Sequence, residues 1–545
     1  MSSPRPYSRL LGALALAAAL LAPASAFAGS LLALDFETAL PSGVTTTDGL
    51  GTVDTFIGSP GRALSAAGRV STGRIAISNT VGDLAKLTVG FDVHVATLAP
   101  VRVTLASFDA TGRRTGARTA LVVPPVASSF YRFSLDLDKT ENLDGAFYPL
   151  APSIEFTFAA ESAADVALRI DNLSYTAPSF YVSPTGSDSA DGRTAATAFA
   201  TPQRAADAAR PGDVILLMDG TYVSPGHPDI SDVPADTINS PLWRPWWVEK
   251  TGGNLTIKNA GTPAAWIVLR AHPGHRPVLF NAEGWHGVRF GLTSAYVEVR
   301  GLTIQGNAPK LDLAEATADA ARFEKDGLLY HGAARFNANG ILADGRAEKG
   351  SGPRPHHLRI IDNTLLENSG AGVTLIGVEH VTIEGNVSHD NCHFMRYGSS
   401  GLSTLLTWNW DAGTGHKIFF VRNTSHGNRT DVPCSIVEHD ENGKPLPRRL
   451  TDKFSDGNGI IIDVNQNNAK SVHVPYPPYH ARTLVQNNLV FNNGGSGIHT
   501  VSSDHVDILH NTAYLNSASP HIEYSQIYTY ASDDVRITHN ILVAP

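Results

Sequence analysis

The sequence predicts an all-β protein in which an antiparallel β-sandwich precedes a parallel β-helix. From Ser30 to about Pro178, short segments with alternating apolar and polar residues follow one another between turn signals, which favours a sandwich. After this point one motif recurs, in which a β-branched strand reaches an Asn and a second Asn usually follows five residues later. Such a repeat is typical of the stacked coils of a solenoid.

The N-terminus has the pattern of a secretory signal. Arg5 and Arg9 precede the apolar run from Leu10 to Leu21, and the sequence Ala-Phe-Ala ends at residue 28. The run is too short to span a bilayer. We therefore expect residues 1–28 to be a cleaved signal peptide and the protein to be secreted or periplasmic, with a retained N-terminal anchor as the alternative. No later stretch has the length and apolar character of a membrane span.

The composition is that of an ordinary globular protein with more than one core. The chain has 545 residues, of which 42% are hydrophobic and 17% charged. The net charge of −9 argues against a nucleic-acid partner, since such proteins carry a basic surface. The two cysteines, Cys392 and Cys434, are too few for a disulfide scaffold, so one bridge and two separate buried thiols are both open. We expect a monomer.

Residues 29–177 form the predicted sandwich. Its candidate strands are LLALDFE, AKLTVGFDVHVA, VRVTLASFD, FYRFSLDLD, SIEFTFAA and VALRIDNLSY. The opening LDFE and the closing LRIDNLSY resemble the first and last strands of jelly-roll carbohydrate-binding modules. This resemblance implies a structural calcium ion held by Glu37 and Asp171. All seven tryptophans follow residue 240, so a purely structural or accessory sandwich stays open beside a sugar-binding module.

The segment after Pro178 predicts a short capping helix and a first strand. Thr201 can cap a helix whose first position is Pro202, and Pro211-Gly212 stops it. A strand from Val214 to Leu217 follows and ends in a turn. The passage FYVSPTGSDSADGRTAATAFATPQRAADAARPGDVILLMDGTYV resembles the first segment of secreted proteins of the pectate-lyase-like superfamily. The resemblance implies a right-handed parallel β-helix over residues 178–545, with the helix covering its open end, and says nothing about substrate.

Asparagines mark the coils of the predicted solenoid. The repeated strands begin at Val297, Leu358, Val381, Ile418, Thr483, Val506 and Val535, and the Asn pairs are Asn363/Asn368, Asn386/Asn391, Asn423/Asn428, Asn488/Asn493 and Asn511/Asn516. Stacked coils place equivalent Asn side chains above one another, where their amides can satisfy backbone groups of the turns. We therefore interpret these asparagines as architecture.

The spacing between coils indicates where function lies. The first Asn of each pair recurs in steps of 23, 37, 65 and 23 residues, and 23 residues make one bare coil. The longer steps carry extra coils or protruding loops, and the step of 65 could hide a degenerate rung at GNGIIIDVN. Insertions in a solenoid often emerge on its binding face. The segments from about Asn391 to Lys417 and from Asn428 to Arg482 are thus predicted to wall a groove.

The stretch KFSDGNGIIIDVNQN, from Lys453 to Asn467, holds the candidate catalytic residues. A uronate lyase must neutralise the substrate carboxylate with calcium or arginine and remove the adjacent proton with a base. The base is assigned to Lys453, the calcium oxygens to Asp456, Asn458 and Asp463, and the pairing with uronates to Arg448 and Arg449. Lys453 then needs a pKa depressed by the nearby cation.

A hydrolase is the alternative enzyme. It needs two carboxyl groups across the scissile bond, one of them protonated, and Asp456 with Asp463, or either with Asp411, could be that pair. A structural turn for Asp456 and a structural role for Asp463 stay open as well. Trp408 and Trp410, two residues apart on an extended segment, could form a platform for sugar rings or pack against a neighbouring coil.

The ranking of functions rests on charge and on the resemblance. The polygalacturonase-type N-T-D and G-H-G motifs and the pectate-lyase W-I-D-H motif do not occur in the sequence. Cationic loops on an acidic protein suit an anionic polymer, although they are also compatible with simple solvation. We therefore predict a calcium-dependent lyase acting on a pectate- or alginate-like polysaccharide, followed by a glycoside hydrolase and by a non-catalytic glycan-binding surface protein.

Overall fold

The computed structural model describes residues 30–34, 51–55, 61–67, 69–76, 87–162, 167–225, 232–234, 252–322, 324–325, 328–330, 332–346, 352–436, 449–467 and 477–544. The expected signal peptide, Glu37 and Arg448 lie outside these residues. The described chain is mostly strand, with helices α1 (Pro202–Ala208) and α4 (Leu313–Ala320) and 3₁₀ turns at 137–139, 195–197, 308–310 and 334–336. No helix in the described ranges has the length and apolar character needed to cross a membrane.

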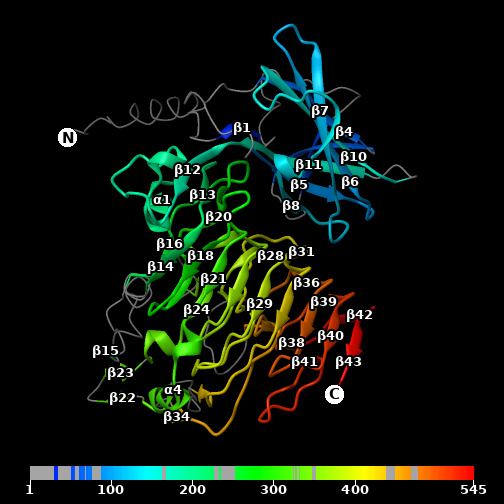
Figure 1. Cartoon of the computed structure of the whole chain (residues 1–545). Helices are drawn as coiled ribbons and strands as arrows, with labels where there is room; N and C mark the ends of the chain where they lie inside the picture. Colours follow the sequence, from blue (N-terminus) through cyan, green and yellow to red (C-terminus); the bar gives the residue numbers. More distant parts are fainter. Residues whose placement is uncertain are drawn as a thin grey trace, which may run out of the picture.

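Three long parallel sheets run side by side along the C-terminal part (Figure 1). Sheet 1 contains β12 (Pro178–Val182), β13 (Val214–Leu217), β17 (Ile267–Ala271), β20 (Ala295–Arg300), β25 (His356–Ile361), β28 (Glu379–Glu384), β31 (His416–Val421), β36 (Arg482–Gln486), β39 (Val506–Leu509) and β42 (Val535–Thr538). Sheet 2 contains β14 (Gly220–Val223), β18 (Pro277–Phe280), β21 (Thr303–Gln305), β26 (Thr364–Leu366), β29 (Val387–His389), β32 (Thr424–His426), β37 (Leu489–Phe491), β40 (Thr512–Tyr514) and β43 (Ile541–Val543).

Sheet 3 contains β16 (Gly253–Ile257), β19 (His286–Phe290), β24 (Asn339–Asp344), β27 (Val373–Ile376), β30 (Leu402–Leu405), β35 (Ile460–Asp463), β38 (Ile498–Val501) and β41 (Ile527–Tyr530). Short strands outside the three sheets are β15 (Asp232–Pro234), β22 (Glu324–Lys325), β23 (Leu328–Tyr330), β33 (Ser435–Ile436) and β34 (Arg449–Leu450). Alternate residues of each solenoid strand point inward, where Ile460, Ile462 and Ile498 have no exposed area. The three sheets thus close around one core, which confirms the parallel β-helix.

The Asn ladders predicted from the repeat are present. The backbone N–H of Asn363 donates to Oδ1 of Asn386 at 3.0 Å, and the side-chain Nδ2 of Asn363 donates to the same atom at 3.1 Å. The same pattern continues through Asn423 and Asn488. A second ladder joins Asn368, Asn391, Asn428, Asn493 and Asn516. Because all ten side chains are buried, their amides satisfy backbone groups that water does not reach.

The long repeat steps are loops and hold no extra coil. Asn423 bonds directly to Asn488, and β31 pairs with β36, so the step of 65 residues is a single coil. The prediction of a degenerate rung at GNGIIIDVN is therefore wrong. That stretch forms β35, the sheet 3 strand of the same coil, because each coil contributes a strand to each sheet and the Asn motif marks only sheets 1 and 2.

The capping helix begins as predicted. Oγ1 of Thr201 accepts a hydrogen bond from the backbone N–H of Arg204, and Pro202 is the first helical residue. The helix ends at Ala208, three residues before the predicted stop at Pro211. Ala205 and Ala206 are buried against the first coil, so the helix covers this end of the core.

Two antiparallel sheets precede the solenoid. One contains β2 (Gly51–Thr55), β3 (Gly61–Ala67), β11 (Ala167–Thr176), β5 (Thr88–Val95) and β8 (Tyr131–Asp136), with β1 (Ser30–Leu34) beside β11. The other contains β4 (Arg69–Ala76), β10 (Ser153–Ala160), β6 (Val101–Phe108), β7 (Arg114–Val122) and β9 (Glu141–Gly145). Phe91 of the first sheet and Phe158 of the second lie in one apolar core, so the sheets pack face to face.

The first antiparallel sheet also contacts the outer face of sheet 1. The hydroxyl of Tyr131 donates to Oε2 of Glu384 at 2.6 Å, and Nη1 of Arg359 donates to the carbonyl oxygen of Arg132 at 2.6 Å. Arg359 also forms a buried ion pair with Glu298, with Nε 2.8 Å from Oε2. Tyr131 packs in addition against Phe419. Charged and apolar contacts therefore join the two antiparallel sheets to the solenoid.

Candidate active site

The candidate site lies on the outer face of sheet 3. In β35, β38 and β41, His499 lies between Ile461 and Tyr528, and Val501 lies between Asp463 and Tyr530. These residues alternate with the inward-pointing core residues, so their side chains stand together outside the solenoid.

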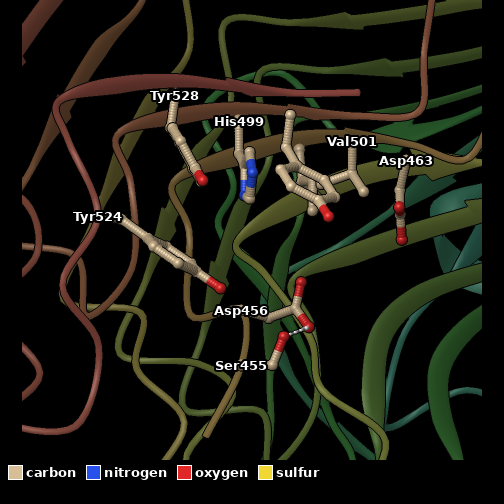
Figure 2. A pocket seen from close by; sticks show the side chains of 9 residues that line it. Ser455, Asp456, Asp463, His499, Val501, Tyr524 and Tyr528 are labelled. Atoms are coloured by element: carbon tan, nitrogen blue, oxygen red, sulfur yellow. Dashed lines mark hydrogen bonds between the residues drawn. The ribbon is translucent and has the colours of Figure 1, made fainter. Parts of the chain in front are cut away.

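A pocket of about 280 Å³ opens on this face. The turns that precede two of the strands complete its wall, and its lining consists of Ser455, Asp456, Ile461, Asp463, His499, Val501, Tyr524, Tyr528 and Tyr530. Figure 2 shows Asp456, Asp463 and His499 around the same space. The structure thus brings together two of the predicted catalytic residues and adds a histidine and three tyrosines. No lysine or arginine is among these lining residues.

Asp456 is held in the turn before β35. Its φ of 67° lies in the left-handed region and that of Gly457 is 68°, so the chain turns sharply here. The hydroxyl of Ser455 donates to Oδ2 of Asp456 at 3.1 Å. A Cβ on Gly398 would lie 2.3 Å from the same oxygen, which explains a glycine there. Burial raises the pKa of Asp456, while hydrogen bonds from Ser455 and Ser400 favour its charged form.

Asp463 ends β35 and receives no such support. Its backbone oxygen accepts a hydrogen bond from the N–H of Leu406, but its carboxyl group has neither a hydrogen bond nor an ion pair within the part of the chain that the structure describes. Burial and, second, the charge of Asp456 raise the pKa of Asp463 to about 8. At neutral pH Asp463 is therefore mostly protonated. Burial raises the pKa of both groups, and only Asp456 has serine hydroxyl groups that oppose the rise.

His499 was not among the residues expected from the sequence. Its side chain is 5% exposed and its ring lies 4.8 Å from that of Tyr528 and 5.2 Å from that of Tyr524. Neither ring nitrogen has a hydrogen-bond partner in the described structure. Burial lowers the pKa of His499 to about 4, so the imidazole is neutral. Aligning GIHTV with GIIID in adjacent coils would have placed His499 beside Ile461.

Lys453 and Asn458 do not line the pocket. The side chain of Lys453 is exposed, and its backbone oxygen accepts a hydrogen bond from the N–H of Cys434. Asn458 is fully buried, and its Oδ1 accepts from the N–H of Ser496 at 2.8 Å while its Nδ2 donates to Oγ of Ser400 at 3.0 Å. Both amide atoms of Asn458 therefore serve the scaffold.

These positions test whether calcium fits the pocket. The hard cation takes six to eight oxygen ligands. Without Asn458, the carboxyl groups of Asp456 and Asp463 offer at most four. The remaining ligands would be water, hydroxyl or backbone oxygens, so calcium binding at the pocket stays a prediction.

Asp411 belongs to a separate ionic cluster. The cluster lies where strands β28 and β31 of sheet 1 begin. Its Oδ1 lies 2.8 Å from Nζ of Lys417, and its Oδ2 lies 2.8 Å from Nε2 of His380. Lys417 also contacts Glu379 at 3.0 Å. Glu379, His380 and Asp411 lie close enough together for a metal, and the buried ammonium of Lys417 offsets one of the two carboxylate charges. Although burial raises the pKa of Asp411, hydrogen bonds from His380 and Lys417 lower it below its ordinary value.

The two tryptophans have different partners among the described residues. The guanidinium of Arg354 lies 3.6 Å from the ring centroid of Trp408, which also packs beside Leu406. Trp410 is 45% exposed and stacks on His356, with centroids 3.7 Å apart and an interplanar angle of 23°. One face of each ring is thus already covered by a side chain of the protein.

The remaining predicted residues lie away from the pocket or outside the described structure. The backbone of Arg449 lies in β34, which pairs with β33. Asp171 is buried, and its Oδ1 accepts a hydrogen bond from the N–H of Asn172 at 2.8 Å. Since Glu37 is not described, the calcium site of the sandwich stays a prediction. Cys392 and Cys434 are both buried free thiols, which is the second of the two alternatives for the cysteines.

Comparisons with known proteins give only distant likenesses. The sequence matches no protein-family model and no curated protein. The chain is similar to pectate lyase Pel9A, with 14% identity over 66% of this chain and 77% of that chain and a TM-score of 0.35. It is similar to the catalytic domain of Agl-KA, with 11% identity over 95% and 98% and a TM-score of 0.24.

A third likeness covers the N-terminal part. It is to the family 11 carbohydrate-binding module from Clostridium thermocellum in complex with a β-1,3-1,4-mixed-linked tetrasaccharide, with 15% identity, 28% of this chain, 98% of that chain and a TM-score of 0.22. Identities and TM-scores this low carry no conclusion about activity, so function has to be inferred from the pocket.

Proposed function

We propose that the protein is a polysaccharide-cleaving enzyme, a glycoside hydrolase that acts with the carboxyl pair Asp456 and Asp463. One observation carries this proposal: both carboxyl groups line a single pocket whose described lining contains no lysine or arginine. Hydrolysis of a glycosidic bond needs two carboxyl groups that flank the bond and differ in protonation. The shared pocket and the protonated state of Asp463 support this assignment for Asp456 and Asp463.

The surroundings of the two groups assign their roles. Asp463, which keeps its proton, gives it to the glycosidic oxygen as the bond from that oxygen to the anomeric carbon breaks. Asp456, supported by the Ser455 hydroxyl, either attacks the anomeric carbon or takes a proton from the water that does so. In the second case the proton of water moves to Asp456 and its hydroxide joins the anomeric carbon.

The tyrosines supply a surface suited to a sugar. Tyr524, Tyr528 and Tyr530 line the pocket with rings that offer apolar faces and with hydroxyl groups that can bind sugar oxygens. Tyr530 is 59% exposed, so it lies at the mouth. Together with the predicted signal peptide, this pocket supports action on a glycan outside the cytoplasm.

A uronate lyase is the second candidate, and His499 favours it. A neutral imidazole beside tyrosine hydroxyl groups provides the base and acid that β-elimination needs. The substrate carboxylate must also be neutralised, and Lys453 does not reach the lining. We rank the hydrolase first because the described pocket has paired acids and no cation, the reverse of the order that the sequence favours.

The products of cleavage distinguish the two reactions. The full chain is incubated with pectate, alginate, xylan and mixed-linkage β-glucan, with and without a chelator. New reducing ends without unsaturated-uronate absorbance, unaffected by the chelator, support the hydrolase. Unsaturated-uronate absorbance that grows with the reducing ends and disappears with the chelator would contradict the hydrolase. It would indicate a calcium-dependent lyase instead.

A further inference from the structure

We infer that His499 recognises the sugar in the pocket, donating a hydrogen bond from one ring nitrogen to a sugar hydroxyl and accepting one at the other. This inference rests on the proposed function, since it takes the pocket as the sugar site. Its ligand is a neutral sugar unit of a polysaccharide. The structure supports it through the position, the burial and the missing partners of this one side chain.

The ring of His499 is fixed before any ligand binds. His499 stands on the outer face of β38, and its two aromatic neighbours, Tyr524 and Tyr528, contact the ring from different segments. These rings also contact each other, with centroids 5.3 Å apart. Packing thus holds the imidazole in place without using its nitrogen atoms, and an oriented polar group binds a ligand with little loss of conformational entropy.

Neither ring nitrogen of His499 has a protein partner among the described residues, and the residue lines the pocket. His499 is only 5% exposed, yet neither ring nitrogen has a hydrogen-bond donor or acceptor beside it among the described residues. Buried polar groups are normally hydrogen-bonded, because an unmade bond is costly. Since His499 lines the pocket together with Asp456 and Asp463, a sugar bound for cleavage is positioned to supply the missing bonds.

The charge state of the ring selects the class of ligand. A neutral imidazole offers one N–H donor and one nitrogen acceptor, and sugar hydroxyl groups can meet both. The low pKa of His499 keeps it neutral at physiological pH. An anionic sugar would find no cation in the described lining and would face the two carboxyl groups. The neutral imidazole and the two carboxyl groups together favour a neutral sugar.

His94 offers a matched control within the same chain. It lies in β5 of the sandwich, is 4% exposed, has no partner for either ring nitrogen, and has a pKa lowered to about 4. It does not line the pocket. The two histidines therefore share burial and protonation, and only His499 adjoins a site that can take a ligand.

Binding to the full chain tests the inference. Calorimetry is performed with cellobiose, laminaribiose, maltose and xylobiose on wild type, His499→Phe, His499→Gln and His94→Gln. We expect at least one sugar to bind wild type, His499→Phe to weaken it about tenfold or more, and His499→Gln, which keeps a donor and an acceptor, to stay within about threefold. His94→Gln should bind like wild type.

The outcomes separate this inference from the proposed function. Equal binding by wild type and His499→Phe overturns the inference, and so does a wild type that binds none of the four sugars. Circular dichroism spectra and melting temperatures check that each variant is folded, so that the binding of folded proteins is compared. A protein that binds sugar through His499 but releases no reducing ends from any glycan would leave the inference standing and contradict the hydrolase.

Discussion

Asp456 and Asp463 lie seven residues apart and reach the same pocket from two different elements. Asp456 stands in the turn before β35, and Asp463 ends the strand on its outer face. The charge of Asp456 contributes to the raised pKa of Asp463, so the two groups titrate as a coupled pair. A change in the charge of Asp456 therefore changes the pKa of Asp463.

Asp463→Asn should abolish most of the activity. The amide keeps the size of the side chain but cannot give a proton to the leaving oxygen, so we expect kcat to fall about 10²- to 10⁴-fold. The rate of appearance of reducing ends measures this. Asp452→Asn, at an exposed carboxyl group outside the lining, is the control and should stay near wild type. Comparable losses in both variants would contradict the assignment.

The activity should fall at alkaline pH. Asp463 must be protonated to act, and its pKa is about 8, so kcat decreases as the pH rises through this value. A pH profile of kcat measures the midpoint. An alkaline limb that stays level well above pH 8 would show that Asp463 is not the acid.

The same group links stability to pH. Its pKa is higher in the folded than in the unfolded chain, where it is near the ordinary 3.8, so the folded state binds more protons between the two values. The stabilisation is complete below about 4 and is lost as the pH rises to about 8. Melting curves of wild type should therefore show a larger decline across this window than those of Asp463→Asn. Parallel declines would contradict the raised pKa.

Lys453→Ala tests the base of the lyase. The side chain is exposed and outside the pocket lining, so the hydrolase predicts less than about twofold change in activity. Loss of activity by two or more orders of magnitude, together with sensitivity to a chelator, would restore the lyase as the better reading.

Arg359→Met should destabilise the protein by about 3–5 kcal/mol, because it leaves the buried carboxylate of Glu298 without its closest partner. Urea unfolding measures the change. Arg114→Met is the matched control, since the Arg114–Asp144 pair is about half exposed and should contribute less than about 1 kcal/mol. Similar effects in both variants would show that burial of the Arg359–Glu298 pair adds little to its contribution.

Asn423→Ala should cost at least about 3 kcal/mol of unfolding free energy. The side chain donates to the carbonyl of Ile383 and to Asn488, and accepts from the backbone and side chain of Asn386. Its removal leaves several buried groups without partners, each costing about 1–3 kcal/mol. Asn142→Ala, on the exposed strand β9, should change the stability by less than about 0.5 kcal/mol.

The sequence was informative about the scaffold because scaffold residues repeat. The Asn ladders, the strand from Val214 to Leu217 and the Thr201 cap all follow from local patterns that recur or have fixed spacing. The strand β35 was misassigned because a coil contains three strands, and only two of them end in the Asn signature. The Asn signature marks only the strands of sheets 1 and 2. It therefore cannot assign a strand without the signature, such as β35, to its place in the coil.

The site was only half predictable for a related reason. Asp456 and Asp463 are apparent from the sequence because an acidic, Gly-rich turn leads there into an apolar run. His499 lies 36 residues later, in a segment that resembles every other coil, and it becomes a neighbour only through the register of β35 with β38. Lys453 was weighted for its charge, but whether a flexible side chain reaches a pocket depends on the path of the turn, which the sequence does not specify.

The contact between sandwich and solenoid has a consequence for how the enzyme meets a polymer. A sugar-binding module on a flexible linker raises the local concentration of substrate over a range of separations. Here Tyr131, Arg132 and Ser134 are bonded to three strands of sheet 1, so any glycan held by the sandwich lies at one distance and angle from the pocket. If the proposed hydrolase holds its glycan on the sandwich as well, this fixed span selects polymers whose stiffness and repeat match it.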